Sequence, residues 1–285
     1  MFQYKFFNLT KNKHLVILII FLNFFLNLNS KGVPIGAWRY HLPFNNVFAV
    51  ANTGSLYWAC NPYYLYNYDF NTNEINIFSR LNKLSDIKLS AFAIDKIHSL
   101  IILGYENGNI DIFNYKTEKV RNVPDIFLKP IIGSKTINHI YINGDEAYFS
   151  TDFGIVVYDL KKFEFRNTYY LSQYYQNKKI KTTFIFKDTV FSLFDNFIIN
   201  APIDGSNLND FSNWSIFYSD NNNIIFADAL KDDLYMVIDS GCNDHILRYH
   251  DGLWDTVLDT LNFNINKLKY DNNKFIILAE GAVFI

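Results

Sequence analysis

Short apolar runs divided by polar turns recur along the chain from about residue 47 to the C-terminus. The pattern is clearest in four successive runs, at residues 137–142, 146–151, 154–159 and 163–166. Each run is too short for a typical helix and is rich in β-branched and aromatic residues, which favour strands. A unit of four short strands that repeats about every 40 residues indicates the blades of a β-propeller.

The same template covers most of the chain and predicts an all-β fold, a β-propeller of about six four-stranded blades. The first two blades are expected at residues 47–51, 55–60, 64–69 and 75–79, and at 89–94, 99–105, 109–114 and 119–123. The third blade contains the four runs above, and the next two are expected at 181–186, 189–194, 197–201 and 214–218, and at 224–230, 234–239, 245–249 and 254–258. The sixth has only three expected strands, at 265–270, 274–279 and 282–285.

The residues between the runs agree with this interpretation. Asn107-Gly108, Asn143-Gly144 and Asp251-Gly252 are dipeptides typical of tight turns, and each falls between two expected strands. The run at residues 99–103 is nearly continuous in apolar side chains. A strand covered by neighbouring blades on both faces has this character, so we expect it to be fully buried.

The segment before the first blade can supply the strand that the sixth blade lacks. Trp214 and Trp254 each lie in the last strand of a blade, and Trp38 stands at the same distance before the first blade. Residues 37–42 therefore read as an outer strand with no blade of its own. It either completes the sixth blade and closes the ring, or the chain is cut within a longer propeller.

The N-terminus has the features of a secretory signal. Lys5, Lys11 and Lys13 precede an apolar run at residues 15–28, and small polar residues follow. The run is shorter than the roughly 20 residues needed to span a bilayer. We expect a signal peptide at residues 1–30 and a propeller domain at 31–285, exported to the periplasm or the outer-membrane surface; a retained N-terminal anchor is the alternative.

Composition and charge exclude one class of partner. Aromatic residues make up 18% of the chain, and the formal charge of −2 falls to −5 when the three lysines of the leader are removed. An acidic domain lacks the basic surface that nucleic acids require, so nucleic-acid binding is not expected. Cys60 and Cys242 lie in different predicted blades, and we expect two buried, unpaired thiols.

Four segments resemble a known family. They are residues 36–42, 84–86, 105–111 and 150–157, of which the last reads Ser150-Thr151-Asp152-Phe153-Gly154-Ile155-Val156-Val157. Together they are similar to the N-terminal β-propeller of the PorZ family, which belongs to the type IX secretion system of Bacteroidetes. The segment at 84–86 is also similar to loops of two-component-regulator propellers.

The PorZ resemblance implies a place in the cell-surface attachment complex. There a sortase-like protease removes cargo signals and joins the cargo to anionic lipopolysaccharide, and PorZ-like proteins act without catalysis. The resemblance also implies a seven-bladed first propeller, a second propeller and a C-terminal β-domain implicated in lipopolysaccharide recognition. This sequence does not match those later parts, so lipopolysaccharide binding is not carried over to it.

No residue pattern predicts a metal or a cofactor. Cys242, His245 and His250 offer zinc-type ligands, but the two histidines are five apart on an expected strand and point to opposite faces. Residues 69–80 begin like a calcium loop, yet Glu74 replaces the required glycine and Arg80 the final carboxylate. An ordinary polar turn is expected there.

Catalysis is not predicted either. No nucleophile elbow is present, and Glu106 and Asp111, the best carboxylate pair, are separated by five residues across a strand. Their expected role is to solvate a turn.

Tyrosines are the candidate contact residues, because tyrosine is enriched at protein interfaces. We expect most of the seven tyrosines named below to serve in packing between blades. Tyr174 and Tyr175 stand in an expected loop before the fourth blade and are the best candidates for an interaction surface. The full set comprises Tyr63, Tyr64, Tyr66, Tyr169, Tyr170, Tyr174 and Tyr175.

The sequence thus favours a non-enzymatic scaffold of the type IX attachment complex, with no catalytic, metal or cofactor site. Its expected partners are the sortase-like protease and other outer-membrane subunits. The alternative is a ligand-sensing propeller of the two-component-regulator type that binds a small carbohydrate in its central channel.

Overall fold

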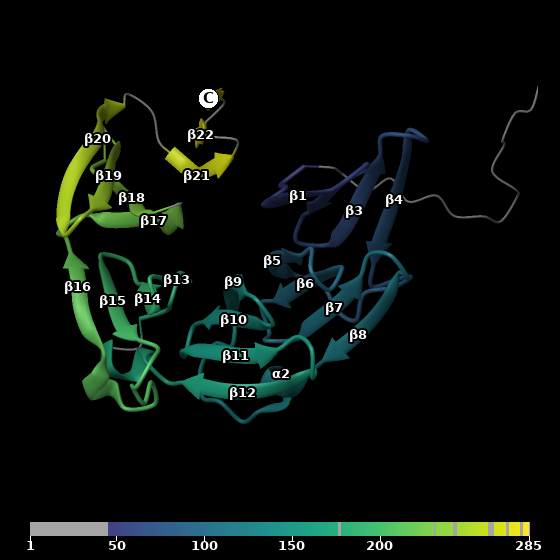
Figure 1. Ribbon diagram of the computed structural model, residues 1–285. Helices are drawn as coiled ribbons and strands as arrows, with labels where there is room; N and C mark the ends of the chain where they lie inside the picture. The colour runs from purple at the N-terminus through teal and green to yellow at the C-terminus, as the bar shows by residue number, and fades with distance from the viewer. Residues whose placement is uncertain are drawn as a thin grey trace, which may run out of the picture. The chain divides into compact units, whose positions relative to one another are not determined.

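Each predicted blade is an antiparallel sheet whose strands are neighbours in chain order (Figure 1). The computed structural model describes residues 45–175, 178–230, 232–241, 244–261, 265–271, 274–279 and 282–284. The expected signal segment 1–30 and the expected strand 37–42 lie outside these residues. The leader, the domain boundary and closure by the N-terminal strand therefore stay predictions.

Five of the described sheets have four strands and one has three. The first two contain β1 (Ala49–Thr53), β2 (Leu56–Cys60), β3 (Tyr64–Asp69) and β4 (Glu74–Ser79), and β5 (Leu89–Asp95), β6 (Leu100–Tyr105), β7 (Ile110–Asn114) and β8 (Lys119–Val123). The next two contain β9 (Ile137–Asn143), β10 (Glu146–Thr151), β11 (Ile155–Asp159) and β12 (Glu164–Tyr169), and β13 (Thr182–Phe186), β14 (Thr189–Leu193), β15 (Phe197–Pro202) and β16 (Ser215–Ser219). The last two contain β17 (Asn223–Leu230), β18 (Asp233–Asp239), β19 (Asp244–His250) and β20 (Leu253–Leu261), and β21 (Ile265–Asp271), β22 (Lys274–Ala279) and β23 (Ala282–Phe284).

The predicted all-β propeller is confirmed, and most strand ends lie within two residues of their expected positions. One clear difference is the outer strand of the third blade, expected at 163–166 and found as β12, Glu164–Tyr169. Phe163 belongs to the preceding turn: its φ is 57°, and its N–H donates to the carbonyl of Asp159 at 2.8 Å. An apolar side chain in a left-handed turn position cannot be recognised from hydrophobicity alone.

Three short helical segments among the described residues were not predicted. They are α2 (Asp125–Leu128), η1 (Ser172–Tyr175) and η2 (Phe211–Asn213). The predicted tight turns are confirmed, since Gly108, Gly144 and Gly252 all have positive φ, at 87°, 60° and 87°. Glycine takes this conformation without the steric cost that a Cβ brings.

The first strands of successive sheets pack against one another. Contacts join β1 to β5, β5 to β9, β9 to β13, β13 to β17 and β17 to β21. Such a series of neighbouring first strands is what the inner strands of consecutive propeller blades form. Each of the four middle sheets therefore packs against the sheets before and after it in the chain.

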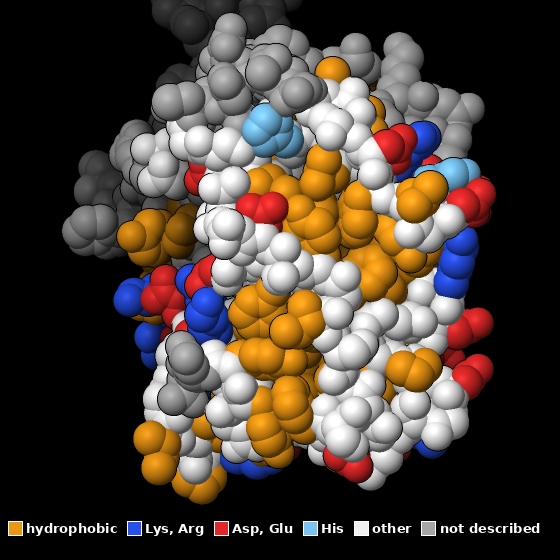
Figure 2. Space-filling view, turned by 90° about the vertical axis from the view of Figure 1, so that its left-hand side faces the viewer, with side chains coloured by type: hydrophobic (Ala, Val, Ile, Leu, Met, Phe, Trp, Pro, Cys, Tyr) orange, Lys and Arg blue, Asp and Glu red, His pale blue; other side chains and the backbone are white. Residues whose placement is uncertain are grey.

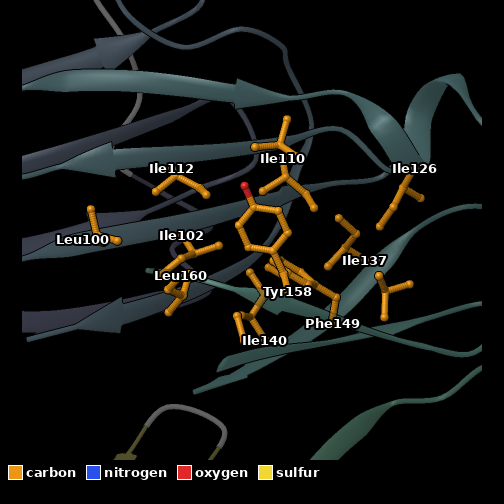
Figure 3. Packing of buried hydrophobic residues seen from close by; sticks show 14 residues of the cluster. Leu100, Ile102, Ile110, Ile112, Ile126, Ile137, Ile140, Phe149, Tyr158 and Leu160 are labelled. Carbon is orange, nitrogen blue, oxygen red and sulfur yellow. The ribbon is translucent and has the colours of Figure 1, made fainter. Parts of the chain in front are cut away.

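A large apolar cluster fills the space between the second and third sheets (Figure 3). Ile102 and Ile112 come from the second sheet, and Ile137, Phe149 and Tyr158 from the third. Every residue of β6 is buried, which confirms the expectation for the run at 99–103. Burial of β-branched and aromatic side chains on both faces is the main stabilising contribution here.

The structure confirms the expected state of one cysteine. Cys60 is buried and unpaired, and burial raises the pKa of its thiol. A thiol that stays protonated is a poor nucleophile, so Cys60 has a packing role. Cys242 lies outside the described residues.

Candidate functional site

The two candidate tyrosines lie in η1, the short helical segment between β12 and β13, but they have different neighbours. Tyr175 turns toward the fourth sheet, where its ring centroid lies 5.1 Å from that of Phe194, 4.9 Å from that of Phe197 and 5.4 Å from that of Phe211. Burial among these rings raises the pKa of its hydroxyl. Tyr175 thus anchors the segment.

Tyr174 remains at the surface, with 52% of its area exposed. One face of its ring stacks on Phe211, with centroids 4.1 Å apart and planes 7° from parallel. Stacking fixes the ring and leaves its other face to solvent. A rigid, half-exposed tyrosine loses little side-chain entropy on binding, which is why such residues serve as contact points at interfaces.

The partner ring is held by a well-ordered connection. Phe211 begins η2, which is capped by Asp210 accepting a hydrogen bond from the Ser212 N–H at 2.9 Å. That hydrogen bond holds the pKa of Asp210 below its ordinary value. Trp214, which follows, is buried and donates from Nε1 to the carbonyl of Leu208 at 3.0 Å. The contacts of Asp210 before Phe211 and of Trp214 after it hold this segment in place. The ring on which Tyr174 stacks therefore has a fixed position.

The sequence did not reveal Phe211 as part of this surface. Phe211 lies between β15 and β16, far along the chain from η1, and no spacing rule connects the two turns. Among the other candidate tyrosines, Tyr64 and Tyr169 are buried, so the prediction that they could be surface contact residues is wrong. Tyr63 and Tyr170 are exposed, as expected of contact candidates.

The expectation for Asp111 is also wrong. Its side chain is completely buried and accepts hydrogen bonds from the Tyr105 hydroxyl at 2.6 Å, the Ser85 N–H at 2.7 Å and Asn122 Nδ2 at 3.0 Å. Burial, with the Asp111 charge next, raises the pKa of Tyr105. Asp111 therefore joins three elements instead of solvating a turn, whereas Glu106 is exposed and pairs with Lys88.

The residues that were considered as calcium or zinc ligands make ordinary structural contacts. Asp69 Oδ1 accepts from the Asn71 N–H at 2.8 Å, so residues 69–73 form the expected polar turn. His250 contacts Asp233 and Asp251. Within the described ranges, no group of three or more His, Cys, Asp and Glu side chains could hold a metal ion.

A second apolar surface covers β16 and β20, on the left-hand side of Figure 1. Figure 2 shows hydrophobic side chains gathered in a band on this face. Phe217 and Trp254 meet across the two strands with ring centroids 5.8 Å apart, and Ile216 and Leu253 beside them are largely exposed. Phe217 and Trp254 also pack against the buried cluster that the fourth and fifth sheets share, so this surface closes the seam between those sheets.

A match to a protein-family model establishes the family to which the chain belongs. The family model described as the type IX secretion system PorZ N-terminal β-propeller domain matches residues 57–215, more than half of the chain. The chain belongs to this PorZ family. The matched region leaves out β1 but covers the rest of the first sheet, the second and third sheets and β13, β14 and β15 of the fourth, and it includes η1 and η2.

Solved structures of related fold include PorZ itself. The PorZ of Porphyromonas gingivalis, a surface component of the type IX secretion system, is 21% identical with a TM-score of 0.67, and the match covers 82% of this chain and 30% of that one. The extracellular domain of a hybrid two-component system of B. thetaiotaomicron is 15% identical with a TM-score of 0.61, covering 84% and 33%. That of a one-component system from the same organism is 14% identical with a TM-score of 0.60, covering 83% and 31%.

At these low identities, the TM-scores show a shared propeller fold alone. The chain spans about a third of the length of the proteins to which it was matched. No curated protein matches it. No helix in the described part of the chain has the length and apolar character needed to cross a bilayer.

Proposed function

We propose that this protein is a non-enzymatic scaffold of the type IX secretion attachment complex. The observation that carries the proposal is the match of residues 57–215 to the PorZ N-terminal propeller. A propeller presents connecting loops on a rigid framework, which suits docking and needs no bond-making groups. Its proposed place is the periplasm or the outer-membrane surface, and the PorZ of P. gingivalis, a surface component of the type IX system, supports an exported location.

The Tyr174–Phe211 pair is the docking point in this proposal. Its partners are the sortase-like protease and other outer-membrane subunits, and the scaffold assists removal of cargo signals and anchoring of cargo. The pair combines an exposed ring with a fixed position, supported by the packing of Tyr175. Rigid aromatic residues of this kind contribute a large share of binding energy at protein interfaces.

Pull-down from native membranes tests both parts. The tagged full chain should recover the protease subunit and outer-membrane components, and Tyr174→Ala should reduce that recovery about tenfold, as expected for an aromatic hot spot. Tyr57→Ala is the matched control, because Tyr57 has the same exposed fraction as Tyr174 but lies in β2 of the first sheet, away from η1. Its recovery should equal that of the wild type.

Two outcomes contradict the proposal. Absence of every envelope component from the wild-type pull-down removes the scaffold role. Equal recovery with Tyr174→Ala and wild type removes the docking point while leaving the scaffold role in place.

A ligand-sensing propeller is the second candidate. The similarity to extracellular domains of one- and two-component systems favours it. The arrangement of genes distinguishes the two: a histidine-kinase reading frame continuous with this one favours the sensor, and adjacent secretion genes favour the scaffold.

A further inference from the structure

A pocket of about 660 Å³ opens between the loops that flank the third sheet. Its lining residues come from the loops at 131–134, 152–153 and 170–173, together with Lys179, and all of them lie outside the strands. The volume lies in the range of small-molecule sites. The pocket is separate from the Tyr174–Phe211 pair, whose two residues do not line it.

One wall of the pocket is aromatic. Tyr170 is 40% exposed, and its ring lies 5.9 Å from that of Phe153 at an angle of 36°. Lys129 Nζ lies 5.6 Å from the centroid of Tyr170, within reach of a cation–π contact. Phe153 also lines a second hollow of about 470 Å³, so the aromatic wall borders two hollows of the surface.

Apart from Ile131, Ile132 and Gly133, the rest of the lining is polar, and one group in it lacks a hydrogen-bond partner among the described residues. Ser172 is only 3% exposed, and its Oγ has no hydrogen-bond partner among the described residues. Buried hydroxyls are normally satisfied, so the Ser172 hydroxyl is available to a hydrogen-bonding partner that the described residues do not supply. Gln173 offers both a donor and an acceptor, Lys179 a donor, and Asp152 an acceptor.

The Asp152 loop is fixed in place before any ligand arrives. Asp152 Oδ1 accepts from Asn138 Nδ2 at 2.9 Å, and the same nitrogen donates to the carbonyl of Ile180 at 2.9 Å. Thr151 Oγ1 accepts from the Gly154 N–H at 3.0 Å and donates to the Gly154 carbonyl at 2.7 Å. A preformed site loses less entropy on binding than one that must be ordered.

We propose that this pocket binds a neutral saccharide of one or two rings. A sugar ring has an apolar C–H face that packs on an aromatic ring such as Tyr170, and hydroxyls that both donate and accept. The pocket supplies hydrogen-bond donors and acceptors for these hydroxyls through Ser172, Gln173 and Asp152. The site lies among surface loops of the third sheet, and the proposal is independent of the secretion role.

Other ligand classes fit less well. The Asp152 carboxylate in the wall repels a phosphate or carboxylate ligand and offsets the charge of Lys179. A peptide that binds by adding a strand needs an exposed strand edge, and none of the lining residues belongs to a strand.

Saturation-transfer NMR with the full chain tests the proposal. The probes are D-glucose, D-mannose, D-galactose, N-acetyl-D-glucosamine, maltose and cellobiose, with D-glucose 6-phosphate and D-galacturonic acid as anionic counterparts. At least one neutral probe should bind with a Kd of about millimolar or tighter. Tyr170→Ala should weaken that binding at least about tenfold, and Ser172→Ala about threefold to tenfold.

The Tyr57→Ala variant again serves as the control and should bind like the wild type, because Tyr57 does not line the pocket. Because Tyr170 is exposed, its replacement leaves the core intact, which the unfolding midpoint can verify. The proposal is overturned if none of the neutral probes shows saturation transfer, if the anionic probes bind in preference, or if Tyr170→Ala binds as well as the wild type. None of these results affects the Tyr174 pull-down.

Discussion

At Asp111, three hydrogen-bond donors from separate parts of the second sheet and its preceding loop meet one buried carboxylate. The linear pattern could not show this, because an aspartate beside an Asn-Gly turn is usually solvated. Its burial depends on Ser85 and Asn122, which the folded chain brings to it. The burial and hydrogen-bond partners of a single polar residue are therefore the features that the sequence predicts least well.

Removal of this acceptor should be costly. We expect Asp111→Ala to lower the free energy of unfolding by about 3 kcal/mol, because buried donors left without an acceptor cost about 1–3 kcal/mol each. Urea denaturation followed by circular dichroism measures the change. Glu106→Ala is the control: its ion pair with Lys88 is exposed and contributes less than about 1 kcal/mol. Equal losses in the two variants would show that the Asp111 network is not stabilising.

Gly154 is constrained by space and not by its backbone angle. A Cβ at this position would lie 2.0 Å from the carbonyl oxygen of Tyr169, whereas one at Gly54 would meet nothing within 4 Å. We expect Gly154→Ala to cost more than about 2 kcal/mol because backbone must shift, and Gly54→Ala about 1 kcal/mol because its φ is positive. Thermal unfolding compares them, and the reverse order would contradict the packing argument.

At the scale of elements, the strands were predictable and the helical segments were not. Alternating or continuous apolar runs between turn residues identify strands directly. Segments as short as α2 and η1 carry no helical periodicity and form only because tertiary contacts hold them. Tyr174 and Tyr175 were found as a pair, but their division into one exposed and one packed ring depends on η1, and the Phe211 partner depends on η2.

The β18–β19 hairpin contains a pH-dependent contact. The hydrogen bond from His250 to Asp233, aided by the charges of Asp233 and Asp251, raises the pKa of His250 above 6.5. A raised folded-state pKa means that the stabilising contribution is complete below 6.5 and is lost as the pH rises through the folded-state value.

Replacement of this histidine should therefore matter mainly in acid. We expect the wild type to exceed His250→Gln in melting temperature near about pH 5, with the difference shrinking toward about pH 9. Differential scanning fluorimetry across this range measures both proteins. A difference that is constant with pH, or that grows in alkali, would contradict the assignment.

Across the whole molecule, stability depends on contacts between sheets. Gly104 in the second sheet faces Ile137 in the third so closely that a Cβ at 104 would lie 2.7 Å from Cγ2 of Ile137. Ser90 Oγ also donates to the Ile137 carbonyl at 2.8 Å. The repeat in the sequence predicted that these sheets are neighbours, but not how closely their side chains interlock.

A double-mutant cycle tests this close approach. Gly104→Ala should destabilise the wild type by about 1–3 kcal/mol through overpacking. The same change should cost about 1 kcal/mol less in an Ile137→Ala background, where the obstructing methyl is absent. Urea denaturation of the four proteins gives the coupling energy, and simple additivity would show that the two residues do not interfere.

The connection between β15 and β16 differs from the tight turns elsewhere in its sheet. Residues 207–214 are held by hydrogen bonds such as that from Asn213 Nδ2 to the Asn207 carbonyl, whereas a Cβ at Gly205 would meet no atom within 4 Å. Lengthening a loop costs only about 0.6 kcal/mol for each doubling. A fluorophore tag or purification handle inserted at Gly205 would thus leave the strand ladder unbroken, giving a reporter placed a few residues from the aromatic pair.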